Sequence, residues 1–390
     1  MCRLQIKTPI RCLHLADLHI GYESRELGSI AQQRMRERDS LLRKAADFAL
    51  DDRNKVDVVL IAGDLFETHT PSASTVEEVM RELRRLEEQG ILVVICPGNH
   101  DEITYTDSVY RVYESRVPGV LVRCPMPEHV CTRLIRGVPL HIYGMAYTGG
   151  ITRTLPALSE FPRLDEPGIH VALFHGSLGA SSGDRSVPLD KAGLACARYD
   201  YVALGHFHRF IEEDLPYPGG VSKAVYPGLI ETRGFFDEGH GMLTVVDILP
   251  AHARITKTSV DTRVYRTVEI DLTIIADAEQ FARRLRQVAA DVGSGAIIRL
   301  RLLGHPQFTI NPEDVQAEFA CFFHHLEVAA ETTNFVPHDI ELWSREPTIR
   351  GEFIRAIEKM KSETTDEHNA TLLQLALLYG LQAMQGGERR

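Results

Sequence analysis

Short apolar runs alternate with helical periodicity over the first two thirds of the chain. Five continuous runs predict buried strands, because each ends at polar residues or glycine; they cover residues 13–16, 56–62, 92–96, 170–174 and 201–204. Apolar residues at three- and four-residue spacing over 76–86 predict an amphipathic helix between the second and third strands. This order predicts a largely parallel α/β sheet with right-handed crossovers. Runs at 242–248 and 253–260 lack a helix between them and predict antiparallel strands.

The order of strand-like and helix-like segments changes after residue 264. Strand-like and helix-like segments then alternate as β-α-β-α-β, over residues 265–272, 277–290, 296–303, 312–323 and 326–330. Two helical patterns follow, at 352–361 and 370–384. The pattern predicts an α/β chain with three parts: residues 1–262, a smaller second domain at 263–335, and a helical C-terminal tail at 336–390.

Composition narrows the class of protein. The chain has 390 residues, 44% of them hydrophobic and 25% charged, as in ordinary globular proteins. Its formal net charge of −11 excludes a protein that is basic all over and coats nucleic acid. The 7 cysteines are scattered and never spaced as C-x-x-C, which argues against a disulfide framework or a thiolate zinc site and predicts a cytoplasmic protein. The apolar stretch 372–381 is about half the length of a membrane span.

Polar side chains with metal-binding chemistry follow all five of the predicted parallel strands. In α/β sheets, ligands bind beyond the carboxyl ends of the strands, so we expect these side chains to meet at one edge of one sheet. They are Asp17 and His19 in ADLHIG, Asp64 in AGDLFE, Asn99, His100 and Asp101 in PGNHDE, His175 in FHGS, and His206 and His208 in LGHFH.

The residue types indicate a two-metal site. Carboxylate, imidazole and amide oxygen suit Mn, Fe, Zn or Ni. With Asp64 bridging, seven ligands can hold two ions about 3.5–4 Å apart, the arrangement that activates water for in-line attack on phosphorus. His100 would contact a phosphate or leaving oxygen, with Asp101 as its orienting partner. A single D-x-H or H-G motif would be weak support, whereas five ordered matches favour a functional site.

The ordered set D-x-H, G-D, G-N-H-D, H-G and G-H-x-H resembles the calcineurin-like metallophosphoesterases. The wording LHLADLHIG followed by AGDLFE resembles one branch, the SbcD-type DNA double-strand-break repair nucleases. For residues 1–262 the resemblance implies a metallophosphoesterase-type β-sandwich core flanked by helices. For residues 263–335 it implies a capping-like DNA-binding domain, on layout alone.

The resemblance also implies roles for individual residues. It puts Asp17, His19, Asp64 and His208 around one metal, and Asp64, Asn99, His175 and His206 around the other, with His100 as the catalytic histidine. It implies Mn-dependent exonuclease or endonuclease action on DNA, a homodimer, and an SbcC-like coiled-coil ATPase bound by the C-terminal region. One departure is Glu67, which stands where some relatives carry a second histidine; a carboxylate cannot stabilise a phosphate as imidazolium does.

Several alternatives stay open at this point. The substrate of the same chemistry could be a nucleotide, a cyclic nucleotide or a phosphoprotein, and a non-enzymatic DNA-end-binding scaffold would keep the fold without activity. Arg283, Arg284, Arg286, Arg299 and Arg301 form either a phosphate-contacting surface or a solvated charged face. The broad apolar face of the tail helix docks either on its own chain or on a partner protein. Two bound divalent ions would add four positive charges locally, so the net charge does not exclude a nuclease.

Overall fold

A computed structural model of the chain describes residues 8–147, 159–179, 186–237, 241–306, 308, 310–332 and 337–386. The chain forms two compact units, Met1–Thr262 and Arg263–Arg390. The predicted boundary between residues 335 and 336 lies outside the described residues. Among the described residues, no helix is both long enough and apolar enough to cross a bilayer.

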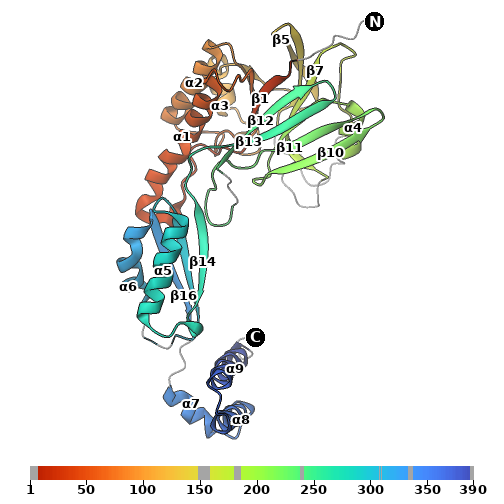
Figure 1. Cartoon of the computed structure of the whole chain (residues 1–390). Helices are drawn as coiled ribbons and strands as arrows, with labels where there is room; N and C mark the ends of the chain where they lie inside the picture. The colour runs from red at the N-terminus through yellow and green to blue at the C-terminus, as the bar shows by residue number, and fades with distance from the viewer. Residues whose placement is uncertain are drawn as a thin grey trace. The chain divides into compact units, whose positions relative to one another are not determined.

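The first unit is built on two mixed sheets (Figure 1). One has the order β13-β12-β1-β2-β3-β4, and its strands are β1 Ile10–Leu15, β2 Val58–Ala62, β3 Leu92–Cys96, β4 Val120–Leu121, β12 Met242–Leu249 and β13 His252–Ser259. The other has the order β10-β11-β9-β7-β6-β5, with β8 beside β7, and its strands are β5 Glu128–Ile135, β6 Val138–Met145, β7 Ile169–Leu178, β8 Val187–Leu189, β9 Tyr201–Gly205, β10 Ile211–Tyr217 and β11 Gly220–Tyr226.

The five predicted buried strands are present, but they do not share one sheet. β1, β2 and β3 are parallel neighbours in the first sheet, whereas β7 and β9 are parallel neighbours in the second. The prediction of a single sheet was wrong, because a strand buried on both faces has the same continuous apolar pattern in either layer of a sandwich. The antiparallel pairing of β12 with β13 is confirmed.

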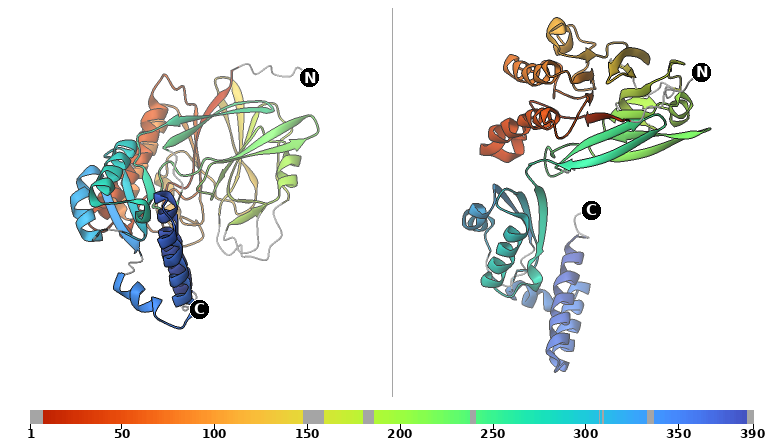
Figure 2. Two further views of the ribbon diagram at one scale, coloured as in Figure 1. Left: turned by 60° about the horizontal axis from the view of Figure 1, so that its bottom comes forward. Right: turned by 45° about the horizontal axis from the view of Figure 1, so that its top comes forward.

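One apolar core lies between the two sheets. Leu13 and Leu60 of the first sheet belong to the same buried cluster as Ile142 and Leu173 of the second. Four α-helices are described in this unit: α1 Ala31–Leu50, α2 Ala73–Glu88, α3 Val109–Val112 and α4 Lys191–Ala197. Helices α1 and α2 contribute to the same cluster, while α4 packs into a second cluster on the other sheet. Figure 2 (right) shows α1 and α2, in red and orange, on the opposite side of the unit from the green strands.

Helix α2 coincides with the predicted amphipathic helix. The residues predicted to form its apolar face are buried, and the Ser72 side chain caps the helix by accepting a hydrogen bond from the Thr75 N–H, 3.2 Å away. Ser, Thr, Asp and Asn are the preferred residues at this position, because their side chains satisfy an amide that the first turn leaves free.

The second unit begins with a three-stranded parallel sheet of order β14-β15-β16. Its elements confirm the predicted β-α-β-α-β pattern: β14 Tyr265–Asp271, α5 Ala278–Val292, β15 Ile297–Gly304, α6 Pro312–Phe319 and β16 His325–Thr332. Three helices follow: α7 Pro337–Ser344, α8 Ile349–Glu363 and α9 Glu367–Gly386. Both predicted tail helices are present, and α7 is an addition.

The structure bears on two open questions about this unit. Arg299 pairs with Glu327, and Arg301 pairs with Glu269 and Glu331, so these guanidinium groups are engaged in ion pairs across the sheet. For Arg299 and Arg301, this favours the solvated charged face. On the tail, Leu377 and Leu381 of α9 are buried with Ile354 and Ile357 of α8, so much of the apolar face packs on its own chain.

The central histidine of β1 gives a first testable prediction. His14 is fully buried, its Nδ1 lies 2.8 Å from the Tyr201 hydroxyl, and burial lowers its pKa to about 3. Unfolding exposes this histidine, whose pKa then becomes about 6.5, so the unfolded chain binds one proton more than the folded chain at pH values between the two pKa values. The free energy of unfolding therefore falls as the pH drops below about 6.5, by up to about 1.4 kcal/mol per pH unit. His14→Asn should therefore weaken the acid dependence of the free energy of unfolding by about one proton.

Urea denaturation at a series of pH values measures this effect. The exposed His252 provides the matched control, since His252→Asn should leave the pH dependence as it is in the wild type. An unchanged pH slope in His14→Asn would show that His14 is protonated equally in both states.

Candidate metal centre

The ends of β1 and β2 lie side by side and carry the first three predicted ligands. The Asp17 N–H donates to Gly63 O over 3.1 Å, and the His19 N–H donates to Asp64 O over 2.9 Å. Asp17, His19 and Asp64 all have left-handed backbone conformations, with φ of 54°, 46° and 51°. Such φ values are uncommon outside glycine and cluster at functional sites, where the surrounding structure holds them.

The second sheet approaches these strand ends closely. His206, directly after β9, has φ 114°, and its N–H donates to both carboxylate oxygens of Asp17, at 3.0 and 3.1 Å. A Cβ at Gly205 would lie 1.8 Å from Ala62 O, and one at Gly98 would lie 2.2 Å from Asp64 Oδ1. Glycine in the G-H-x-H and G-N-H-D motifs is thus required by the close approach of neighbouring chain segments.

Five of the seven predicted ligands fall into overlapping groups, and the other two, Asn99 and His206, lie beside them. Ligand atoms of Asp17, His19 and His208 lie within 4.8 Å of one another, as do those of Asp17, Asp64 and His175. Asn99 Oδ1 lies 3.0 Å from His175 Nε2 and 3.2 Å from His206 Nδ1. The Asp64 carboxylate is close to both groups, because its Oδ2 is 3.8 Å from His19 Nε2 and 3.4 Å from His175 Nε2.

The prediction that His175 follows the end of its strand was wrong. Strand β7 continues to Leu178, where its last residues pair with β8, so His175 lies inside the strand. Its Nδ1 donates to the Ala62 carbonyl over 2.9 Å, which leaves the lone pair of Nε2 facing Asn99 and Asp64. Burial lowers the pKa of His175 to about 4, so the imidazole is neutral near pH 7 and able to bind a metal.

The first group fits a divalent cation on chemical grounds. His208 Nδ1 is 3.0 Å from the Asp237 carboxylate, and His19 Nδ1 is 2.9 Å from Glu67 Oε2, although the second contact is not aligned as a hydrogen bond. The Asp237 carboxylate accepts the Nδ1 proton of His208, which leaves a lone pair on His208 Nε2, 3.3 Å from His19 Nε2. A cation between these two nitrogens would be coordinated by both imidazoles.

The two central carboxylates fit the same conclusion. Asp17 and Asp64 are almost completely buried. Burial raises the pKa of Asp17 well above its ordinary value, with a further contribution from the charge of Asp64, and burial also raises the pKa of Asp64. Two buried carboxylates at close range need positive charge to stay ionised, and bound divalent ions would supply it.

His100 lies beside the ligand groups with its ring partly open to solvent. The backbone N–H of His100 donates to Asp64 Oδ1 over 2.8 Å. The ring of His100 meets that of His19 edge-on, with 4.6 Å between the centroids. Its side chain is 35% exposed, in contrast to the buried ring of His19. A ring nitrogen of His100 also lies within 4.8 Å of ligand atoms of His19 and Asp64, which is close enough to contact a group bound at the centre.

Asp101 has a different role from the one predicted. Its buried carboxylate accepts hydrogen bonds from the Tyr110 hydroxyl and from the N–H groups of Gly98, Leu65 and Phe66, at 2.7 to 3.2 Å. It therefore fixes the two loops that carry Asp64 and Asn99. The prediction that it orients the His100 ring was wrong: His100 Nδ1 instead lies 3.1 Å from Glu67 O and 3.6 Å from Glu67 Oε1.

Sequence reasoning missed the residues that support His208. Asp237 Oδ1 contacts His208, and Asp237 Oδ2 accepts a hydrogen bond from Arg233 Nε over 2.9 Å. Burial alone would raise the pKa of Asp237, but the hydrogen bonds from His208 and Arg233 bring it below its ordinary value. The segment FFDEG that contains Asp237 has no motif, so nothing in the sequence links it to a histidine 29 residues away.

Removing this carboxylate gives a second prediction. Asp237→Ala should lower divalent-metal affinity about 10- to 100-fold, because a ligand histidine that loses its second hydrogen bond is less basic and less well oriented. Isothermal titration with Mn²⁺ measures the change. The exposed Asp214 provides the control as Asp214→Ala, and equal affinities for the two variants would contradict the role of Asp237.

Carboxylate, imidazole and amide side chains that meet beside two stacked sheets define a candidate metallophosphoesterase site. The sequence model of the calcineurin-like phosphoesterase family matches residues 10–210, more than half of the chain. The chain therefore belongs to the calcineurin-like phosphoesterase family.

Three relatives show how far the similarity extends. The DNA double-strand break repair protein Mre11 of Methanopyrus kandleri is 26% identical over 247 residues, which cover 58% of this chain and 53% of that protein. The uncharacterized metallophosphoesterase YhaO of Bacillus subtilis is 27% identical over 60% of this chain and 56% of that protein. The DNA double-strand break repair protein Mre11 of Aeropyrum pernix is 29% identical over 72% of this chain and 69% of that protein. The chain thus aligns with about half the length of the first two relatives.

Proposed function

We propose that the protein is a two-metal phosphodiesterase that cleaves DNA, with Mn²⁺ as the metal. The observation that supports the metal chemistry most strongly is the set of three overlapping groups of possible ligands, two of which contain the buried Asp64. DNA as the substrate is supported by the similarity to proteins named for double-strand break repair. The endonuclease and exonuclease modes, and the cytoplasm as the place of action, belong to the same proposal.

Each ligand has a place in this proposal. Asp17, His19 and His208 hold one ion and Asn99, His175 and His206 hold the other, with Asp64 shared. Divalent ions in such a site lower the pKa of a bound water and neutralise the non-bridging phosphate oxygens. The chain's own contribution is to fix the donors: Asp237 orients His208, and the Ala62 carbonyl orients His175.

His100 is the proposed catalytic residue. Its imidazole stands next to the ligand groups and is partly open to solvent, so it can donate a hydrogen bond to a phosphate oxygen. The Glu67 carboxylate lies close to the Nδ1 atoms of His19 and His100, at 2.9 and 3.6 Å, and Arg233 Nη1 lies 3.8 Å from the same carboxylate. We therefore assign Glu67 to positioning these two rings. We do not assign it to contacting phosphate, the role that a histidine at this position would have.

The remaining parts of the chain have proposed roles as well. We assign residues 1–262 to the nuclease domain, residues 263–335 to a DNA-capping role and residues 336–390 to docking of an SbcC-like ATPase, with a homodimer as the assembly. Support for these roles is the layout of the second unit together with the resemblance to the SbcD-type branch. The paired arginines of β15 argue that DNA contacts, if present in this unit, lie elsewhere on it.

A substrate comparison tests the function. The purified full chain is assayed in Mn²⁺ on linear duplex DNA, cyclic AMP and bis-p-nitrophenyl phosphate. We expect turnover of DNA and of the small diester. Fast hydrolysis of cyclic AMP without DNA cleavage would replace DNA by a cyclic nucleotide, and DNA binding without metal-dependent cleavage would indicate a scaffold.

A further inference from the structure

Two aromatic rings are stacked on the surface near the candidate metal centre. The rings of His69 and Tyr105 lie 4.3 Å apart between centroids and 24° from parallel. Tyr105 is 50% exposed, and the side chain of His69 is 30% exposed. Neither ring belongs to the apolar core, so the pair presents a flat aromatic surface to solvent.

Short chain segments tie this pair to the centre. His69 is two residues from Glu67, whose carbonyl lies 3.1 Å from His100 Nδ1; two residues reach at most about 7 Å. Tyr105 is five residues beyond His100 on the same loop. The Val109 N–H donates to His69 O over 2.7 Å and joins the two segments. The stacked rings are therefore within reach of a nucleotide next to one bound at the centre.

The Tyr105 side chain is held in place before any ligand arrives. Its ring stacks on that of His69, and its carbonyl accepts the Ser108 N–H over 3.1 Å. A ring already fixed by its neighbours loses little conformational freedom on binding, so more of the stacking energy appears as affinity.

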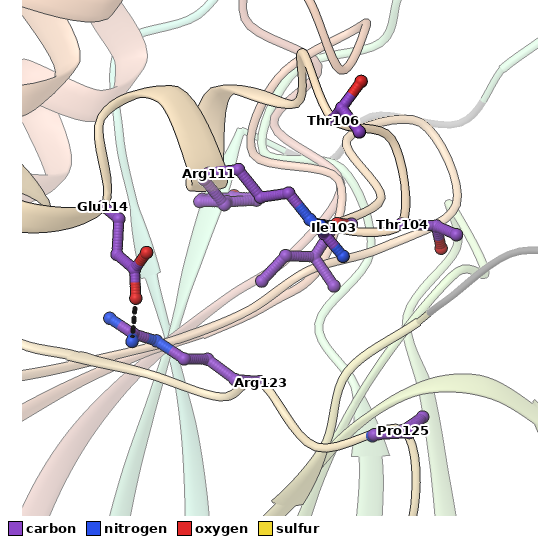
Figure 3. Close-up of a pocket in the computed structure, with 8 residues that line it drawn as sticks. Ile103, Thr104, Thr106, Arg111, Glu114, Arg123 and Pro125 are labelled. Carbon is purple, nitrogen blue, oxygen red and sulfur yellow. Dashed lines mark hydrogen bonds and ion pairs between the residues drawn. The ribbon is translucent and has the colours of Figure 1, made fainter.

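The same loop borders a hollow with two arginines in its lining. Thr104 and Thr106, on either side of Tyr105 in sequence, line a hollow of about 610 Å³ together with Ile103, Arg111 and Arg123 (Figure 3). Arg111 Nε donates to the Ile103 carbonyl over 2.6 Å, and Arg123 forms an ion pair with Glu114, marked by the dashed line in Figure 3. With two guanidinium groups against one carboxylate, the hollow is suited to the phosphate groups of a strand that runs past Tyr105.

We propose that Tyr105, backed by His69, is a stacking subsite for an unpaired base of a DNA strand whose phosphodiester lies at the metal centre. This inference rests on the proposed function and names the form of its substrate. Every base has a π-face, so an aromatic platform binds any base, but only when that base is free of its partner. The subsite therefore favours single-stranded or frayed ends over closed duplex.

The test separates base stacking from the chemistry of the centre. The full chain is compared as wild type, Tyr105→Ala, Tyr105→Phe and, as an exposed control on β5, Leu134→Ala. Binding is measured in Mn²⁺ with a phosphorothioate oligonucleotide that carries 2-aminopurine near one end, a fluorophore quenched by stacking. Turnover of bis-p-nitrophenyl phosphate, which has no base, is measured in parallel.

We expect Tyr105→Ala to bind the oligonucleotide about 5- to 150-fold more weakly, with loss of quenching. Tyr105→Phe and Leu134→Ala should resemble the wild type, and kcat/KM for the small diester should be unchanged in all variants. Wild-type affinity in Tyr105→Ala overturns the subsite. So does an equal loss on both substrates, which would mean that the loop only positions His100. If the wild type turns over neither DNA nor the small diester, the proposed function fails, and the subsite fails with it.

Discussion

Replacing Asp64 by asparagine is expected to reduce Mn²⁺-dependent phosphodiester hydrolysis by about 10³-fold or more, because the proposed ligand shared by both ions would support several kcal/mol of transition-state stabilisation. Asparagine keeps an oxygen that can accept the His100 N–H, and it tolerates the left-handed backbone at this position, where φ is 51°. The fold should therefore survive while the bridging charge is lost. Initial rates on linear DNA and on the small diester measure the loss.

Thermal unfolding separates this loss from misfolding. In metal-free buffer, Asp64→Asn should unfold at the wild-type temperature or above it, because a neutral amide replaces a carboxylate whose pKa is raised by burial. Addition of Mn²⁺ should then stabilise the wild type more than the variant. Asp214→Asn, at an exposed position of β10, should behave as the wild type throughout. Full activity in Asp64→Asn would contradict a two-metal site.

Replacing His100 by alanine is expected to lower kcat about 10²- to 10³-fold while both metals stay bound, since the substitution removes a hydrogen-bond donor to the phosphate and leaves the ligands in place. The backbone N–H of residue 100, which bonds Asp64 Oδ1, remains in the variant. Metal content by elemental analysis and kcat on DNA are the two measurements.

The metal readout is needed because His100 lies as close to Asp64 and His19 as a ligand would. Loss of one ion in His100→Ala would make His100 a ligand and would contradict its assignment as the catalytic residue. His252→Ala, at an exposed position, should change neither quantity.

The strands that carry the site could be predicted because burial gives them an unmistakable pattern. β1, β2, β3, β7 and β9 are buried along nearly their whole length, and each predicted ligand follows or lies near the end of one. The sheet that each strand joins could not be predicted, since pairing partners leave no trace in local apolar content.

Other elements escaped prediction for physical reasons. Helix α1 buries Arg34 and Arg38 on its inner face, where Arg34 pairs with Glu231, so charged residues interrupt its apolar stripe. Strands such as β5 and β10 are exposed along much of their length and carry many polar residues. The contacts of Glu67 and Asp237 with ligand histidines depend on distant segments, so only the folded chain reveals them.

Anomalous scattering from a crystal of the full chain grown with Mn²⁺ tests the central claim most directly. We expect two manganese peaks that share the Asp64 carboxylate, one next to Asp17, His19 and His208 and the other next to Asn99, His175 and His206. A single peak, or manganese bound away from Asp64, would contradict it.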